Sequence, residues 1–215
     1  MADKVTNITF EEGIVDSKYM KPVRMLFERN GLTLIWDMAF ENDSVSIVLY
    51  NTTLKKVMLV KQFRPVVFVR NVLRLPENKG KSLKDVDFTT YDMAIGESIE
   101  LCAGIVDKPL SLEEIAMEEV LEECGYKVED LELVKSFVDG VGISGAEHTI
   151  FFGTASEEQK VSTGGGNKDE GEFVEVLYLT VDEVKDLLKT IHNTPPSLLF
   201  GLSWFLNEKQ ALYQS

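Results

Sequence analysis

Alternating apolar and polar positions predict β-strands along most of the chain, in two groups that meet near residue 43. In the first group, two runs flank Asn30 and Gly31, a dipeptide that favours the tight turn of an antiparallel hairpin. In the second group, a polar excursion at 69–97 lacks sustained periodicity and predicts irregular structure. The predicted strands span residues 23–28, 32–40, 44–50, 56–63, 98–102, 131–139, 148–155 and 173–179.

Helical periodicity predicts helices in the second group only. The first is expected to begin after Ser111, which forms a capping box with Glu114. Gly125 follows this helix, as a terminal glycine commonly does. Thr180 is a candidate cap for the second helix. The predicted helices span residues 112–124, 181–191 and 197–212.

The order of these elements predicts an α/β or α+β fold with a mixed sheet. We place a boundary at residue 43, which separates a small N-terminal antiparallel β domain, 1–43, from a main domain, 44–215. The 215 residues are enough for one sizeable core with a smaller appendage. Because 44% of the residues are hydrophobic and 27% are charged, a packed interior is expected.

The net charge of -14 argues against two classes of partner. Duplex nucleic acid and anionic membranes are both negatively charged, so we expect neither to bind. No run of about 18 apolar residues predicts a membrane span, and the first residues lack an apolar signal core. Cys102 and Cys124 do not form the spacing of a disulfide framework, and we expect reduced thiols in a cytoplasmic protein.

One face of the first predicted helix carries carboxylates where its apolar stripe should continue. At about 100° per residue, three glutamates share this face with three apolar side chains, so the acids point into the protein. Unpaired negative charge is costly there, and a divalent metal with oxygen ligands would neutralise it. A diphosphate is the natural counterpart of such a metal, whereas the alternative is a solvated acidic helix. The six residues are Leu112, Ile115, Ala116, Glu119, Glu122 and Glu123.

Residues 104–126 resemble the Nudix box, whose pattern is G-x5-E-x7-R-E-U-x-E-E-x-G-U, with U aliphatic or aromatic. The register fits without a gap, and the three metal-binding glutamates of that family are present. Two positions differ, because Leu110 stands where the pattern has Glu and Glu118 where it has Arg. We expect Glu118 to add like charge near Glu122 and so to increase the dependence on metal. A Nudix-fold binding module that has lost catalysis is the alternative.

The resemblance extends beyond the box to the UDP-sugar diphosphatase branch of the family, which is similar to the ADP-ribose diphosphatases. It implies a Nudix α/β/α sandwich, a homodimer built with the N-terminal β domain, and hydrolysis that depends on Mg²⁺ or Mn²⁺. The implied substrates are nucleoside diphosphate sugars. UDP-glucose, cleaved to UMP and glucose 1-phosphate, is favoured, and ADP-ribose or another ADP-sugar is the alternative. The matching segments are 36–37, 43–45, 60–65, 100–104, 140–142 and 200–206.

The resemblance also implies a set of metal ligands. Glu119, Glu122 and Glu123 match the three glutamates of the family's box, and Glu122 is also a candidate catalytic residue. Their spacing independently supports a shared ion, because residues at i, i+3 and i+4 are neighbours on a helix. By resemblance, Glu100 joins this cluster and the Ala103 carbonyl supplies a further oxygen. The alternative for Glu100 is an exposed acid at a strand end.

The base that activates water is expected in an acidic loop after the box, as in the ADP-ribose branch. Residues 169–172 resemble that loop, and we favour Glu170 over Glu172. The glycines at 164–166 are expected to be flexible and to let the loop close over substrate. An ordinary solvated acidic loop is the alternative.

Three residues outside the box are candidates for substrate binding. Arg64 follows an apolar strand and can hold a phosphate with two hydrogen bonds, or it can form an ordinary surface salt bridge. Trp36 can stack on a nucleobase, or it can pack in the small domain or a dimer contact. Gly142 lies in one of the segments that carry the family resemblance.

Overall fold

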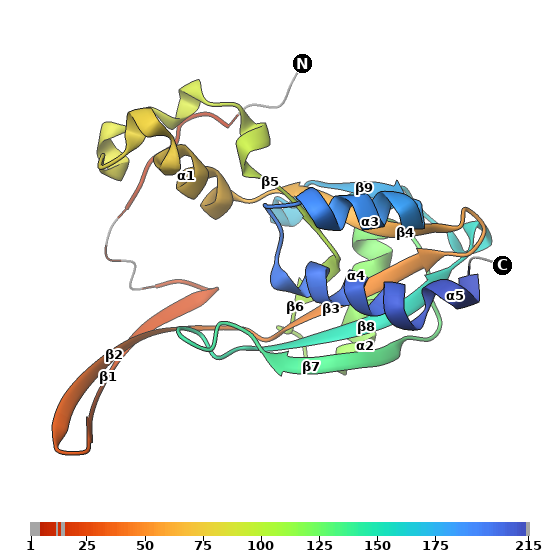
Figure 1. Cartoon of the computed structure of the whole chain (residues 1–215), viewed down its shortest axis with the longest axis horizontal. Coiled ribbons are helices and arrows are strands. Elements are labelled where there is room, and N and C mark those ends of the chain that lie inside the picture. The colour runs from red at the N-terminus through yellow and green to blue at the C-terminus, as the bar shows by residue number, and fades with distance from the viewer. Residues whose placement is uncertain (1–4, 12, 14–15, 214–215) are drawn as a thin grey trace.

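A seven-stranded mixed sheet forms the centre of the protein (Figure 1). The computed structural model describes residues 5–11, 13 and 16–213, apart from the side chains of Glu170, Leu212 and Tyr213. Strands run in the order β5-β4-β3-β8-β7, with β6 also paired to β3 and β9 to β4. The parallel pair β3–β8 makes the sheet mixed, because its other pairs are antiparallel. The strands are β3 (Ser44–Asn51), β4 (Lys56–Phe63), β5 (Glu97–Glu100), β6 (Cys102–Ile105), β7 (Glu132–Val138), β8 (Glu147–Ala155) and β9 (Val174–Leu179).

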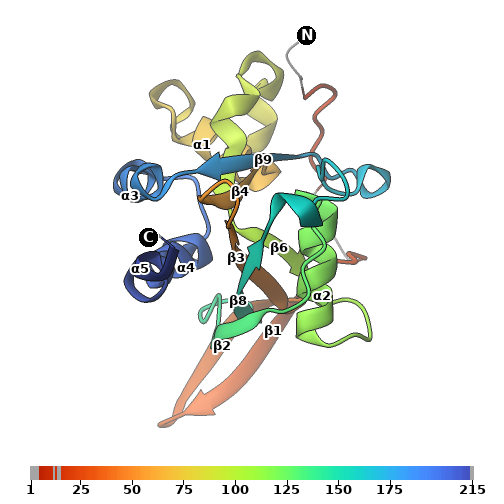
Figure 2. The ribbon, with the colours of Figure 1, turned by 90° about the vertical axis from the view of Figure 1, so that its right-hand side faces the viewer.

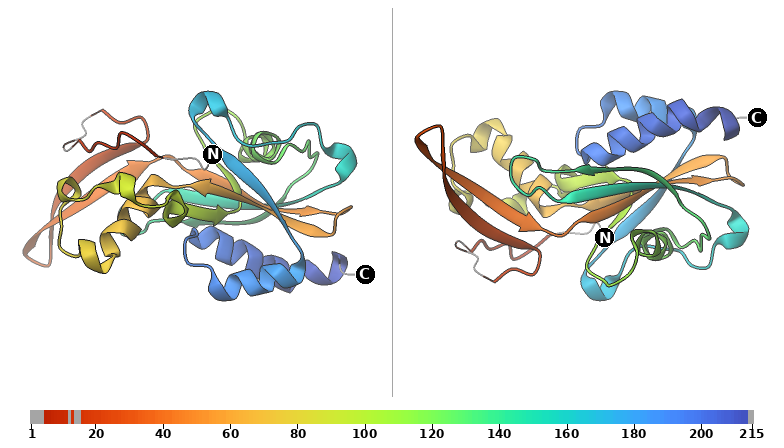
Figure 3. Two further views of the ribbon diagram at one scale, coloured as in Figure 1. Left: turned by 90° about the horizontal axis from the view of Figure 1, so that it is seen from above. Right: turned by 90° about the horizontal axis from the view of Figure 1, so that it is seen from below.

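Helices cover both faces of this sheet, so the predicted α/β/α sandwich is confirmed (Figures 2 and 3). One apolar cluster lies between the sheet and α2 (Leu112–Glu119), and a second lies on the side of α3 (Val181–Thr190) and α4 (Pro196–Glu208), which α5 (Gln210–Tyr213) follows. Strand β3 supplies alternate side chains to both clusters. Burial on both faces explains why its sequence is almost continuously apolar.

The first two strands, β1 (Met20–Arg29) and β2 (Leu32–Glu41), form the predicted hairpin. Asn30 and Gly31 both have positive φ, 54° and 74°, as the tight turn between twisted strands requires. The hairpin extends away from the central sheet (Figure 1). At its base, the Ala39 N–H donates to the carbonyl of Ile143 at 3.0 Å, which ties it to the loop between β7 and β8.

The excursion predicted as irregular at 69–97 is folded, and the prediction missed a helix there. Helix α1 (Pro65–Arg74) is followed by short 3-10 turns, η1 (Pro76–Asn78), η2 (Leu83–Asp85), η3 (Phe88–Thr90) and η4 (Met93–Gly96). Their apolar side chains form a separate cluster around Phe68, Val72 and Phe88. The four turns, of three or four residues each, are too short for helical periodicity to develop. Helix α1 begins at Pro65, between the predicted strand at 56–63 and the predicted polar excursion.

The helix predicted at 112–124 is two segments. Helix α2 has the expected capping box and continues into a π-helical turn, η5 (Val120–Cys124), before Gly125 ends it with φ of 81°. Leu112 is 38% exposed, so its predicted place on the buried face is wrong. The π turn places Val120, Glu123 and Cys124 together in the interior. None of the helices in the described part of the chain is long and apolar enough to cross a membrane.

Candidate active site

Glu123 is the most deeply buried acid of the predicted metal set, at 2% exposure. It lies on η5 and faces β6, where its Oε2 accepts a hydrogen bond from the Ala103 N–H at 2.9 Å. The Cys102 thiol donates a second hydrogen bond to the same carboxylate. These donors hold the carboxylate at the junction between the helix and the strand, so the structure brings Glu123 and Ala103 together.

Glu119 approaches the same strand one turn earlier. Its carboxylate lies against the Cα of Gly104, and a Cβ built at that position would be 2.0 Å from Oε1 of Glu119. No side chain other than hydrogen fits such an approach without moving the carboxylate. Gly104 therefore gives Glu119 its place beside β6.

Both acids have raised pKa values. Burial and then the charges of Glu122 and Glu172 raise the pKa of Glu119 to about 7, while Lys108 opposes them. Burial raises the pKa of Glu123 to about 8, against the two hydrogen bonds that favour its charged form. Holding both carboxylates ionised is therefore costly without a cation.

These residues fit a hard divalent cation by their chemistry, because carboxylate and carbonyl oxygens are the ligands that Mg²⁺ prefers. Two partly or fully buried acids with raised pKa values are the groups that such an ion would stabilise. Within the residues that the structure describes, no three Asp, Glu, His or Cys side chains are grouped closely enough to hold a metal ion. The ligand set remains a prediction, in which some of these side chains turn toward the ion.

Glu100 is directed toward Arg64. The guanidinium donates from Nε to Oε1 at 2.8 Å and from Nη2 to Oε2 at 2.6 Å, a two-bond pair. The Glu100 side chain is 6% exposed and that of Arg64 is 43% exposed, so the acid is buried while its partner reaches the surface. This pairing raises the pKa of Arg64. Glu100 is thus not the exposed strand-end acid of the alternative interpretation, and Arg64 stands at the edge of the acidic site.

The acidic loop faces the same site. Its 3-10 turn is η7 (Lys168–Glu170), and the side chain of Glu170, the favoured base, lies outside the described residues. The charge of Glu172 raises the pKa of Glu119, Glu123 and Arg64, so Glu172 lies within electrostatic reach of all three.

The glycines before that loop dock on the end of the box helix. The Gly165 N–H donates to the Glu123 carbonyl at 2.9 Å, and the Gly166 N–H to the Glu122 carbonyl at 3.3 Å. These bonds satisfy carbonyl groups that a helix end leaves unpaired. The glycine run thus anchors the acidic loop to the metal-site helix, a contact that sequence reasoning missed because the partners are about 40 residues apart.

Lys108 forms an ion pair with Glu118. Its Nζ lies 2.7 Å from Oε2 of Glu118, so the negative charge that we expected to stand unbalanced beside Glu122 is paired. The same ammonium group lowers the pKa of Glu119. A cation therefore reaches this flank of the cluster from the box loop, where the family pattern has Arg on the helix. Lys108 lies within the box itself, and this basic residue was the sequence signal that could have revealed the ion pair.

Trp36 and Gly142 contact each other at the base of the hairpin. The indole Nε1 donates to the Gly142 carbonyl at 3.1 Å, and the tryptophan is 53% exposed. The ring is thus not buried in a core of the small domain, which leaves its exposed surface for a nucleobase or a second subunit.

Gly104→Ala should weaken metal binding at this site by about 10- to 100-fold, the range for changes that disturb the orientation of metal ligands. The added methyl group would displace Glu119, whereas the fold should tolerate it because a flexible side chain can yield. Steady-state rates across a Mg²⁺ series and the melting temperature would measure both effects. In a Glu119→Gln background the same glycine change should add little, and fully multiplicative losses would contradict the link between the two residues.

Comparisons with known proteins identify the family of the chain. The chain matches the family model described as NUDIX domain over residues 41–199. It is 36% identical over 204 residues to the uridine diphosphate glucose pyrophosphatase NUDT14 of Bos taurus, covering 89% of this chain and 90% of that protein. The protein of the same name from Mus musculus is 34% identical over 205 residues, with the same coverage. The GDP-mannose pyrophosphatase of Escherichia coli (strain K12) is 29% identical over 186 residues, covering 86% of this chain and 78% of that protein.

Proposed function

Because the chain belongs to the Nudix hydrolase family, we propose that it cleaves the diphosphate bond of nucleoside diphosphate sugars, with UDP-glucose giving UMP and glucose 1-phosphate as the favoured reaction. The observation that carries this proposal is the convergence of Glu119 and Glu123 on strand β6, with Arg64 within electrostatic reach of Glu123. A cluster of this kind suits a polyanionic substrate only when cations accompany it.

Nudix hydrolases generally need a divalent metal, and we propose Mg²⁺ for this chain. Glu119, Glu122 and Glu123 would hold it, with Glu100 and the Ala103 carbonyl as further ligands. When bound, the metal would neutralise charge that develops on the phosphate oxygens. Glu123 and Glu119 both contact the backbone of β6, at Ala103 and Gly104, which supports their place in this set.

The residues around the metal set have distinct roles in this proposal. Arg64 binds a phosphate through two N–H groups, a geometry that it already uses toward Glu100. A water oxygen forms a bond to one phosphorus while the bond from that phosphorus to the bridging oxygen breaks. The water proton passes to Glu170 or Glu172. The charge of Glu172 raises the pKa of Glu119 and Glu123, which supports Glu172 as the base.

The purified chain should release UMP from UDP-glucose in the presence of Mg²⁺, and excess chelator should stop the release. Parallel assays with ADP-ribose and GDP-mannose would rank the substrates by kcat/KM. Turnover of none of the three would overturn the proposal. If calorimetry then showed binding of a nucleotide sugar without turnover, the chain would be a binding module. The pairing of Glu118 with Lys108 balances one of the two departures that motivate that alternative, and Leu110 is the other.

We also propose a homodimer that forms through the hairpin. Side chains alternate across β1 and β2. One face of the hairpin is mostly apolar, with Lys21 and Arg29 at its two ends, whereas the other carries Leu26 and Ile35 beside the pair Arg24–Asp37. A two-stranded hairpin is marginally stable alone, so an uncovered apolar face favours a second copy as its partner. The apolar face comprises Val23, Met25, Phe27, Leu34, Trp36, Met38 and Phe40.

Met25→Glu should shift the protein from dimer to monomer in size-exclusion chromatography with light scattering, because a charge on the apolar face cannot be buried cheaply. Thr33→Glu adds the same charge on the opposite face of the hairpin and should leave the dimer intact. A monomeric wild-type protein, or equal effects of both variants, would contradict an interface on this face.

Two buried cysteines support a cytoplasmic location as part of this proposal. Cys102 and Cys124 are both buried and free. Reducing compartments keep neighbouring thiols in that state.

A further inference from the structure

The box helix carries two alternative pairs of carboxylates. Glu118 and Glu122 are four residues apart, and this pair exists because Glu118 stands where the family pattern has Arg. Glu119 and Glu123 have the same spacing. Residues four apart are neighbours on a helix, so by sequence either pair could share one ion. A choice between the two pairs must therefore come from the residues around the helix.

The structure places the second pair against β6. Glu119 lies beside Gly104, and Glu123 accepts a hydrogen bond from the backbone N–H of the preceding residue on that strand. Glu118 is instead directed to the loop between β6 and α2, where the Lys108 Nζ lies 2.7 Å from its Oε2. The two pairs are thus separated, because the first acid of the other pair is bound to a lysine.

Lys108 lies close to the acidic turn as a whole. The hydrogen bond from Glu118 raises the pKa of Lys108 most, and the charges of Glu119 and Glu122 raise it further while burial opposes them. The ammonium group is therefore within electrostatic reach of two candidate metal ligands, but its hydrogen bond goes to Glu118. Both side chains of this ion pair are about half exposed, so it should add little to the stability of the fold.

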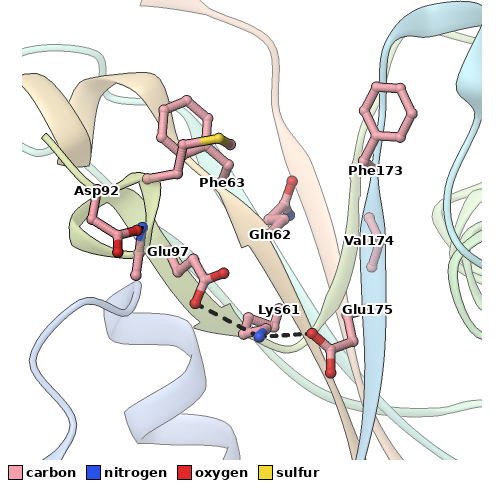
Figure 4. A pocket seen from close by; sticks show the side chains of 10 residues that line it. Lys61, Gln62, Phe63, Asp92, Glu97, Phe173, Val174 and Glu175 are labelled. Carbon is pink, nitrogen blue, oxygen red and sulfur yellow. Dashed lines mark hydrogen bonds and ion pairs between the residues drawn. The ribbon is translucent and has the colours of Figure 1, made fainter. Parts of the chain in front are cut away.

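A second lysine bridges two acids on the other face of the sheet. The Lys61 Nζ lies 2.7 Å from Glu175 and 3.6 Å from Glu97, beside a pocket that opens where β4 and β9 separate (Figure 4). On β4, Lys61 faces the same side as Leu59, which belongs to the cluster beneath α3 and α4. The sheet therefore stands between this lysine and the box acids, which makes Lys61 a matched control for Lys108.

We propose that Lys108 is a positioning residue, which keeps the Glu118 carboxylate out of the metal set so that the ion binds beside β6. The assignment rests on the proposed function and concerns how its metal set is selected. Without Lys108, Glu118 would share the ion with Glu122 and draw it around the helix, away from the strand. An ion displaced in this way would no longer lie where it neutralises charge on the reacting phosphate.

Lys108→Met should have opposite effects on the rate and on metal binding. The kcat for UDP-glucose with Mg²⁺ should fall by about tenfold. Mn²⁺ alone, measured by calorimetry without substrate, should bind about three- to tenfold more tightly, because a further carboxylate joins the site. Melting temperatures should stay at the wild-type value, since the ion pair is exposed.

A second substitution should reverse both effects. In Lys108→Met/Glu118→Gln the competing carboxylate is absent, so kcat and the Mn²⁺ affinity should return to within about twofold of wild type. Glu118→Gln alone should stay in the same range. Lys61→Met, which removes a lysine from two acids on the opposite face, should leave the rate and the Mn²⁺ affinity unchanged.

The measurement with Mn²⁺ separates this proposal from the proposed function. Tighter binding that Glu118→Gln reverses, in a protein that hydrolyses no nucleotide sugar, would refute the function and retain the role of Lys108. Equal losses of rate in both single variants and the double variant would show that the ion pair itself matters, which would overturn the proposal. Unchanged or weaker Mn²⁺ binding by Lys108→Met would overturn it as well, as would a wild-type rate in that variant.

Discussion

Glu123→Gln should reduce hydrolysis of UDP-glucose by about 100-fold or more, since changes to groups that merely orient metal ligands already cost 10- to 100-fold. The amide can still accept the hydrogen bond from Ala103, so the packing of the helix end on β6 should survive. What it cannot supply is a negative charge beside Glu119. Rates measured over a Mg²⁺ series should show a lower maximum and a higher half-saturating metal concentration.

Glu113→Gln provides the matched control. Glu113 is exposed in the first turn of the same helix and faces solvent, so its amide variant should retain the wild-type rate. Equal activity of the Glu123 and Glu113 variants would contradict the metal site. A loss of folded protein in the Glu123 variant, detected by circular dichroism, would instead indicate a structural role.

The stability of the metal-free protein should depend on pH through Glu123. Folding raises the pKa of Glu123 from 4.5 to about 8, so the folded state binds its proton more tightly than the unfolded state. Stability from this group is complete below the unfolded pKa and is lost as the pH rises through the folded one. The free energy of unfolding of the wild type should therefore fall between about pH 5 and pH 8 in the presence of chelator, and Glu123→Gln should weaken that dependence.

Arg64→Met should lower kcat/KM for UDP-glucose by about 100-fold, comparable to removing one preorganised donor from a charged transition state. Its guanidinium now pairs with Glu100, and binding of a phosphate would use the same two N–H groups. Arg64→Lys keeps the charge without the fork of donors and should recover only part of the rate. Kinetics with UDP-glucose would measure both variants.

Arg70→Met is the control for this prediction, because Arg70 is an exposed arginine on α1, the helix that begins directly after Arg64. It should leave the rate unchanged. Full activity of Arg64→Lys would mean that charge alone suffices, and full activity of Arg64→Met would reduce Arg64 to the structural partner of Glu100. Since the Arg64 side chain is 43% exposed, water screens its ion pair and the stability cost should be modest.

Several features of this protein were predictable because neighbouring residues determine them. Ser111 marks the start of the box helix through its capping box with Glu114, as its sequence indicated. Asn30 and Gly31 adopt the positive φ angles that their turn requires. Each of these signals depends on a few consecutive residues, whose local conformations and hydrogen bonds are largely independent of the rest of the fold.

Other features depend on segments far apart in the chain, and only the tertiary structure decided them. Arg64 meets Glu100 because β4 and β5 pair, and the glycine run at 164–166 meets the box helix because β9 returns to β4. The π turn and the burial of Glu123 likewise depend on how the helix packs on β6. The sequence by itself determined which acids lie on one helix. Long-range strand pairing decided which cations and loops face them, because register and packing are properties of the whole sheet.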